Sequence, residues 1–157
     1  KPAMKASREV TVLVRDEEGR ILLLLRPEEQ SFGGMWELPR VQVQHKERVE
    51  AAAQRAVREQ AGLRARVAGP VMRLRHTVMR QRIELVVYRA ISWEGTPDLA
   101  QHIEYQWSSP GEWLKLPKST TQMDIARWVA EGTLPAKNRK PGGGADRPED
   151  FFGLTGL

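Results

Sequence analysis

Residues 34–63 of the chain are GMWELPRVQVQHKERVEAAAQRAVREQAGL, and this stretch contains several structural signals. Between residues 47 and 61 there is no Gly or Pro, alanine is abundant, and apolar residues recur at helical spacing. Gly62 follows directly and is a typical helix stop. The segment before it alternates apolar and polar residues and is interrupted by Pro39, which is typical of short extended pieces. We therefore predict a helix over residues 47–61, preceded by short strands.

Strand-like patterns lie on both sides of this stretch. Upstream, Val10, Val12 and Val14 occupy alternate positions, and a turn at residues 16–19 separates them from the apolar segment 20–26, so a hairpin is predicted. Downstream, four more segments have strand character, at residues 63–67, 71–76, 82–90 and 103–107.

Two further helical segments are predicted late in the chain. Residues 110–114 form a short helical turn, and a helix spans about residues 120–131, where Thr121-x-x-Asp124 resembles a capping box. Strands thus surround one central and one late helix. The pattern predicts an α+β fold with a mixed β-sheet.

The chain has 157 residues, which is enough for one ordinary domain. Residues 1–8 are polar and basic, so we expect a linker, followed by a domain over residues 9–133. Residues 134–157 contain Gly142-Gly143-Gly144 and no core-forming pattern, so we expect a flexible tail.

Composition excludes several classes of protein. There is no cysteine, which removes disulfides, thiolate zinc sites and iron–sulfur clusters from this chain and suits a reducing, cytoplasmic location. The three histidines are too scattered to suggest zinc, and the longest apolar run, residues 21–25, is far too short for a membrane span. We expect a monomer of bacterial, intracellular type that makes no membrane contact.

Positive charge is concentrated in one part of the chain. Residues 40–90 contain 12 basic and 4 acidic side chains, and 11 of the basic residues are Arg. The planar guanidinium matches phosphate groups in a way that Lys does not. This surplus of eight positive charges suggests an anionic partner, with nucleic acid the leading candidate.

Spacing around the central helix resembles the signature of the Nudix hydrolase family. In that signature a Gly is followed after five residues by Glu, then after seven residues by Arg-Glu-U-x-Glu-Glu-x-Gly-U, where U is aliphatic. The matching positions here are Glu47, Arg55, Val57, Glu59, Gly62 and Leu63. The resemblance covers about residues 8–131 and implies an α/β/α sandwich of the Nudix type.

Three departures bear on the chemistry that the resemblance implies. Val41 replaces the first Gly, and Ala56 and Gln60 replace two of three acids in the core of the signature. Residues three and four apart share a helix face, so acids at 56, 59 and 60 would converge on one cation. Mg²⁺ prefers several oxygen ligands, and a single Glu59 is a weak metal site. We therefore predict little magnesium-dependent pyrophosphatase chemistry.

A Nudix signature that lacks some of its acids, as here, also resembles the signature in the C-terminal domain of the MutY-type adenine DNA glycosylases, which is a Nudix relative. The stretch Gly34–Pro39 and the segment Leu74–Thr77 resemble parts of that domain, although Val78-Met79-Arg80 departs from its pattern. The resemblance implies a contact with duplex DNA that carries an 8-oxoguanine mispair. The expected nucleic-acid-binding residues are Arg40, Arg75, His76, Thr77, Met79 and Arg80.

Two hypotheses follow, and the first is favoured. In the first, the chain is the lesion-recognition domain of an adenine glycosylase in base-excision repair, without catalytic residues or cofactor of its own, and an upstream catalytic domain holds an iron–sulfur cluster. In the second, it is a stand-alone Nudix hydrolase that cleaves a nucleoside diphosphate derivative and uses Mg²⁺ at a non-standard site. The acids available to that enzyme are Glu59, Glu47, Glu37 and Glu104.

Overall fold

Two β-sheets organise the residues that the computed structural model describes, 4–135, and the chain forms two compact units around them. One unit contains residues up to 14 together with 38–100, and the other contains residues 15–37 and those from 101 onward. The predicted α+β class with a mixed sheet is confirmed.

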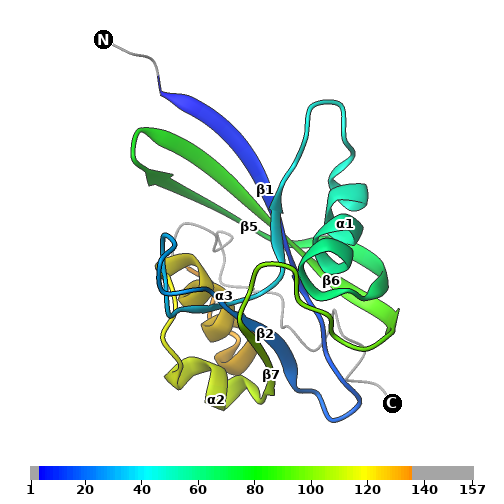
Figure 1. Ribbon diagram of the computed structural model, residues 1–157. Helices are drawn as coiled ribbons and strands as arrows, with labels where there is room; N and C mark the ends of the chain where they lie inside the picture. Colours follow the sequence, from blue (N-terminus) through cyan, green and yellow to red (C-terminus); the bar gives the residue numbers. More distant parts are fainter. Residues whose placement is uncertain (1–3, 136–157) are drawn as a thin grey trace. The chain divides into compact units, whose positions relative to one another are not determined.

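The sheet of the first unit has the strand order β4-β1-β6-β5. Its strands are β1 (Lys5–Leu13), β4 (Arg40–Gln42), β5 (Arg64–Val78) and β6 (Gln81–Glu94). β1 pairs in parallel with β6 along its whole length and antiparallel with β4, while β5 and β6 form a long hairpin. The first half of β1 and this hairpin extend together beyond helix α1 (Figure 1).

Helix α1 (Val49–Ala61) packs on this sheet, against β1, β4 and β5. The side chains that it buries are small, namely Ala52, Ala53, Ala56, Val57 and Ala61. Small side chains let the helix axis approach the sheet closely. The helix ends at Gly62, whose φ of 71° is left-handed, and a Cβ there would lie 2.7 Å from the Asp98 side chain. The predicted helix and its stop at Gly62 are confirmed, although the helix begins at Val49 and not at residue 47.

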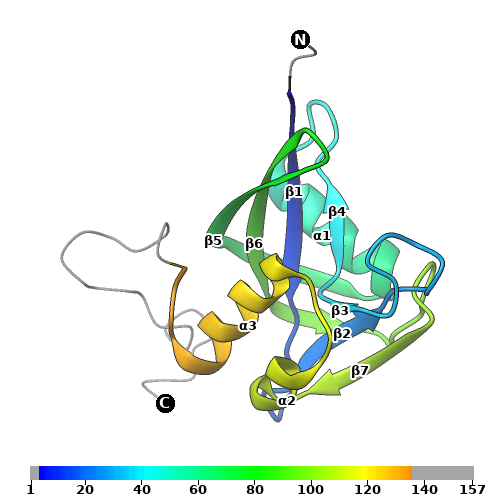
Figure 2. The same ribbon diagram turned by 90° about the vertical axis from the view of Figure 1, so that its left-hand side faces the viewer.

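The second unit contains a three-stranded antiparallel sheet and two helices. β2 (Ile21–Leu25) lies between β3 (Trp36–Glu37) and β7 (Glu104–Ser108). Helices α2 (Pro110–Lys115) and α3 (Thr120–Glu131) follow, and they pack against each other (Figure 2). Trp113 and Trp128 are fully buried in these helices. None of the helices described between Met4 and Pro135 has the length and hydrophobicity needed to span a membrane.

The predicted hairpin of the first two strands is wrong. β1 and β2 lie in different sheets, and the turn between them is closed by an isolated bridge between Arg15 and Ile21 and by hydrogen bonds between Asp16 and Arg20. Both strands are rich in fully buried side chains, so local alternation could not show which distant strand each one pairs with.

Several element boundaries also differ from the prediction. β1 begins at Lys5, inside the expected linker, because it pairs with β6 from that residue onward. Two predicted strands merge into β5, with register shifts near Ala68. The cap of α3 is Ser119, whose hydroxyl accepts from the backbone N–H of Gln122, and not the predicted Thr121. Of the expected tail, residues 136–157 lie outside the described part.

Candidate functional site

Three signature residues meet at one side of α1. Arg55 donates to Glu47 through Nε (2.9 Å to Oε2) and Nη2 (3.0 Å to Oε1), and through Nη1 to Oε1 of Glu59 at 3.0 Å. It also donates to the carbonyl oxygen of Gln42 at 2.7 Å. The side chains of Arg55 and Glu47 are 14% and 15% exposed, whereas that of Glu59 is 51% exposed. We call Glu47, Arg55 and Glu59 the Arg55 cluster.

The Arg55 cluster stabilises the charged form of Glu47. Hydrogen bonds from Arg55 lower the pKa of the Glu47 carboxyl, against the opposing effect of burial, and a bond from the backbone N–H of Gln44 adds to the lowering. In the same way, the bonds to Glu47 raise the pKa of Arg55. Glu47 is therefore an anchored carboxylate.

This anchoring predicts a specific loss of stability in acid. A carboxyl whose pKa is lower in the folded than in the unfolded chain adds stability above its ordinary pKa of 4.5, and the gain disappears as the pH falls through the folded-state pKa. In Glu47→Gln the free energy of unfolding should therefore fall less steeply between pH 6 and pH 3 than in the wild type. Urea titrations at several pH values measure this. The exposed Glu50→Gln on the same helix is the control, and equal slopes in all three proteins would contradict the role given to Glu47.

The residues present do not fit the magnesium site that the signature implies. Ala56 is fully buried and Gln60 has no charge, so Glu59 is the acid that remains at the three helix positions. Arg55 already neutralises much of the charge of Glu47 and Glu59. Among residues 4–135, no group of three or more His, Cys, Asp or Glu side chains is placed to hold a metal ion.

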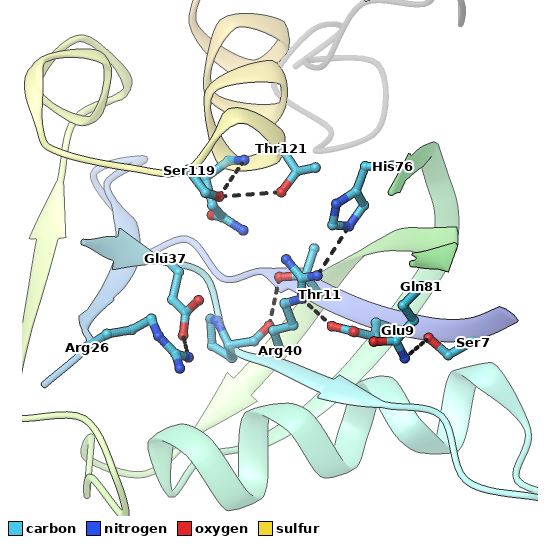
Figure 3. Close-up of polar contacts among 12 residues, drawn as sticks. Ser7, Glu9, Thr11, Arg26, Glu37, Arg40, His76, Gln81, Ser119 and Thr121 are labelled. Atoms are coloured by element: carbon cyan, nitrogen blue, oxygen red, sulfur yellow. Dashed lines mark hydrogen bonds and ion pairs between the residues drawn. The ribbon is translucent and has the colours of Figure 1, made fainter. Parts of the chain in front are cut away.

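The other two predicted acids lie in the second unit. Oε2 of Glu37 accepts from Nη1 of Arg26 at 3.0 Å and lies 2.8 Å from Nε2 of His102, whose side chain is 4% exposed (Figure 3 shows the Arg26 contact). Glu37 is thus a structural anchor, while Glu104 is exposed on β7. No local pattern could indicate the contact between Glu37 and His102, because 65 residues separate the partners.

The segment expected to contact DNA, residues 75–80, lies at the tip of the β5–β6 hairpin. β5 continues to Val78, a two-residue turn is formed by Met79 and Arg80 with φ of 46° and 65°, and β6 begins at Gln81. Met79 is 95% exposed at this tip. Because side chains alternate along a strand, Arg75 and Thr77 point to one side of the sheet and His76 to the other. The predicted binding residues therefore do not form one surface.

Three arginines, two of them from the basic stretch 40–90, surround a single acid on this sheet. Arg8, Arg73 and Arg75 approach the carboxylate of Glu84 at 2.8, 3.7 and 3.9 Å. All three arginine side chains are more than half exposed, so this side of the hairpin carries a net positive charge. We call these four residues the Glu84 cluster.

Polar side chains line the sheet on the side opposite α1 (Figure 3). Arg40 donates through Nε to Oε1 of Glu9 at 2.5 Å, and its Nη2 lies 3.5 Å from Nε2 of His76. The Gln81 amide donates to the Ser7 hydroxyl at 3.0 Å. Of the residues predicted to bind nucleic acid, the structure thus joins Arg40 and His76. We call Glu9, Arg40 and His76 the polar triad.

Comparison with known proteins gives consistent results. A family model described as NUDIX domain matches residues 10–128. The CTP pyrophosphohydrolase of Escherichia coli K12 is 30% identical over 117 residues, which are 74% of this chain and 87% of that protein. Two similar solved structures are the E. coli ORF135 protein (TM-score 0.71, 27% identity, 81% of this chain and 91% of that one) and a MutT protein from Methanosarcina mazei Go1 (TM-score 0.71, 23% identity, 80% and 93%).

These relatives overturn the favoured sequence hypothesis. The chain covers most of a pyrophosphohydrolase and of a MutT protein, and nothing in these matches points to a glycosylase. Assignment to a lesion-recognition domain in DNA repair is therefore wrong, and the upstream domain with its iron–sulfur cluster has no support. The glycosylase domain was inferred from a Nudix signature with missing acids, and such a signature is also compatible with other members of the larger family.

Proposed function

The chain belongs to the Nudix family, and from that premise we propose that it is a hydrolase of nucleoside diphosphate derivatives, nucleoside triphosphates included, with slow turnover. The observation that carries this proposal is the Arg55 cluster, which retains the anchored Glu47 and the half-exposed Glu59 inside the matched region. Similarity to a CTP pyrophosphohydrolase supports a nucleotide as substrate.

In the proposed reaction, water replaces the bridging oxygen on one phosphorus of a P–O–P linkage. Glu59 is the carboxylate of the cluster that solvent reaches most easily, so we assign it the role of accepting the proton from that water. Glu47 and Arg55 are positioning residues, because the bonds of Arg55 to Glu47 and to Gln42 fix the guanidinium that holds Glu59. Slow turnover follows from the missing acids at positions 56 and 60.

The test is a phosphate-release assay with a panel of nucleoside triphosphates and nucleoside diphosphate sugars, with added pyrophosphatase or phosphatase. Weak turnover is expected, and Glu59→Gln should lower it by about 100-fold, the usual scale for loss of a general base. Glu50→Gln, an exposed acid on the same helix, should change nothing. Turnover that persists in Glu59→Gln would contradict the role of Glu59.

A second candidate function is nucleotide binding without hydrolysis. Ala56 and Gln60 favour it, since both replacements remove charge from the helix that the reaction would use. Saturable binding of a nucleotide, together with the absence of any release above a protein-free blank, would establish this second function and reject the first.

A further inference from the structure

One end of the β5–β6 hairpin carries basic side chains and no acidic ones. β1 runs alongside this end, since the backbone N–H of Lys5 donates to the carbonyl oxygen of Arg80 at 3.3 Å (Figure 1 and Figure 2). Residues 4–8 and 71–83 contain no Asp or Glu. Their Lys and Arg side chains are all exposed, and they are Lys5, Arg8, Arg73, Arg75, Arg80 and Arg82. We call these residues, together with Met4 and Met79, the basic tip.

The basic tip also exposes apolar side chains. Met79 is 95% exposed and Met4 is 44% exposed, whereas Met72 of the same hairpin is buried. Because Met4 directly precedes Lys5, both exposed methionines lie at the end of the sheet where the hairpin turns. Methionine is flexible and polarisable, so it adapts to irregular apolar surroundings. This end of the hairpin thus combines positive charge with apolar side chains.

The turn holds Met79 in an unfavourable backbone conformation. Met79 and Arg80 have φ of 46° and 65°, which lie in the left-handed region. Two-residue turns with positive φ at both positions are usually formed by Asn-Gly or Asp-Gly, which adopt this conformation more easily. Backbone strain of this kind is concentrated at functional sites. The two side chains at the turn are therefore candidates for a role outside the fold.

Strand geometry places basic side chains just behind Met79. A strand rises about 3.3 Å per residue, so Arg82 and Arg75 lie about 10 and 13 Å back from Met79 along their strands. Lys5, beside Arg80, lies closer to the turn. The headgroup layer of a bilayer leaflet is about 5–8 Å thick. When Met79 enters the boundary between headgroups and acyl chains, Arg80 and Lys5 therefore lie among the headgroups.

The basic tip fits a lipid surface better than a nucleic acid. Proteins that bind single strands use aromatic side chains in a basic groove as stacking platforms. Among residues 4–135, the exposed aromatic side chains are Phe32 and Tyr105, and both belong to the other unit. Duplex DNA is read by donors and acceptors at base edges, and the Met79 thioether offers no donor. A hairpin end that projects beyond α1, with methionine at its turn and arginine behind it, instead matches a flat anionic surface (Figure 1).

We propose that the basic tip docks on anionic phospholipid bilayers, with Met79 inserted at the headgroup level and the basic side chains paired with lipid phosphates. A guanidinium donates to phosphate oxygens in a bidentate manner. Each basic residue near an anionic surface strengthens binding by about fivefold, whereas one methionine buries too little apolar area to hold the protein on a neutral bilayer. This association is peripheral and needs no spanning helix, so it departs from the expectation of no membrane contact. It is independent of the proposed hydrolysis.

Sedimentation of the full chain with lipid vesicles tests the role of charge. Wild-type protein should bind vesicles of phosphatidylcholine mixed with phosphatidylglycerol, should not bind phosphatidylcholine alone, and should bind more weakly as salt is added. Arg75→Gln should weaken binding by about fivefold. Arg64→Gln is the matched control and should change nothing, because Arg64 lies at the opposite end of β5 with its side chain 80% exposed, against 84% for Arg75.

Met79→Asn separates the apolar contact from the turn. Asn tolerates positive φ, so this variant should melt at the wild-type temperature or above it. Its binding to the anionic vesicles should nevertheless be weaker, because the inserted side chain is lost. A Met79→Asn variant that is folded and binds the vesicles as tightly as the wild type would contradict insertion.

A fluorescent label tests insertion directly. The chain contains no Cys, so Met79→Cys and Ala51→Cys each provide one site for a polarity-sensitive fluorophore. Emission from position 79 should shift to the blue with anionic vesicles, and emission from the exposed position 51 on α1 should not. Absence of vesicle binding, equal losses in Arg75→Gln and Arg64→Gln, or no shift at position 79 overturns the proposal. An oligonucleotide that binds more tightly than the vesicles, and equally well to wild type and Met79→Asn, would assign the basic tip to nucleic acid instead.

Discussion

Ala56→Glu combined with Gln60→Glu is expected to raise nucleoside triphosphate hydrolysis in the presence of Mg²⁺ by at least about 100-fold. The two changes would place three acids, at positions 56, 59 and 60, within one turn of α1. A bound metal ion stabilises developing charge on phosphate by several kcal/mol, and 1.4 kcal/mol corresponds to a factor of ten in rate. The measurement is initial velocity with and without Mg²⁺.

Because Ala56 is fully buried, a Glu at this position could disturb packing, and the double variant therefore needs two control variants. Gln60→Glu alone preserves side-chain volume and should give a smaller, still magnesium-dependent gain. Ala51→Glu adds a carboxylate at an exposed position of α1 and should give none. If folded Gln60→Glu and the double variant both remain at wild-type velocity, the missing acids do not explain slow turnover.

The central helix could be predicted from sequence because its signals are local. Periodic small residues determine its buried face, and Gly62 adopts the left-handed conformation that ends it. The pair between Arg55 and Glu59 is a contact at i and i+4, which helical spacing predicts. Glu47 lies before the helix begins, so its two bonds to Arg55 depend on the path of the chain between β4 and α1.

Contacts between distant segments could not be predicted in this way. β1 pairs with β6, a strand more than 70 residues further along. A pairing at that separation leaves no local pattern in the sequence, so a hairpin with β2 was predicted in its place. Arg40 and His76 were both predicted to bind nucleic acid, but their approach across the sheet and the contact with Glu9 depend on strand order. The turn that joins the two predicted strands 71–76 and 82–90 had no local signal, because Met79 and Arg80 form a tight turn without the usual Gly or Asn.

Replacement of Arg55 by Met is expected to cause the largest loss of stability of any single change in the site. It would leave Glu47, 15% exposed, without its main charge partner and would remove the bond to the carbonyl oxygen of Gln42. Breaking a largely buried pair from one side costs about 3 kcal/mol, because the remaining charge is not compensated. For a domain of this size that loss lowers the Tm by on the order of 10 °C.

Differential scanning calorimetry near pH 7 provides the measurement, and two variants separate charge from packing. Arg58→Met, at an exposed position of the same helix, should leave the Tm within about a degree, as is usual for surface substitutions. The double variant Arg55→Met/Glu47→Gln should recover part of the loss, because no uncompensated carboxylate then remains at position 47. Were the double variant as unstable as the sum of the two single changes, the loss would come from packing of the Arg55 side chain, and the Arg55 cluster would have no electrostatic role in holding the start of α1 to β4.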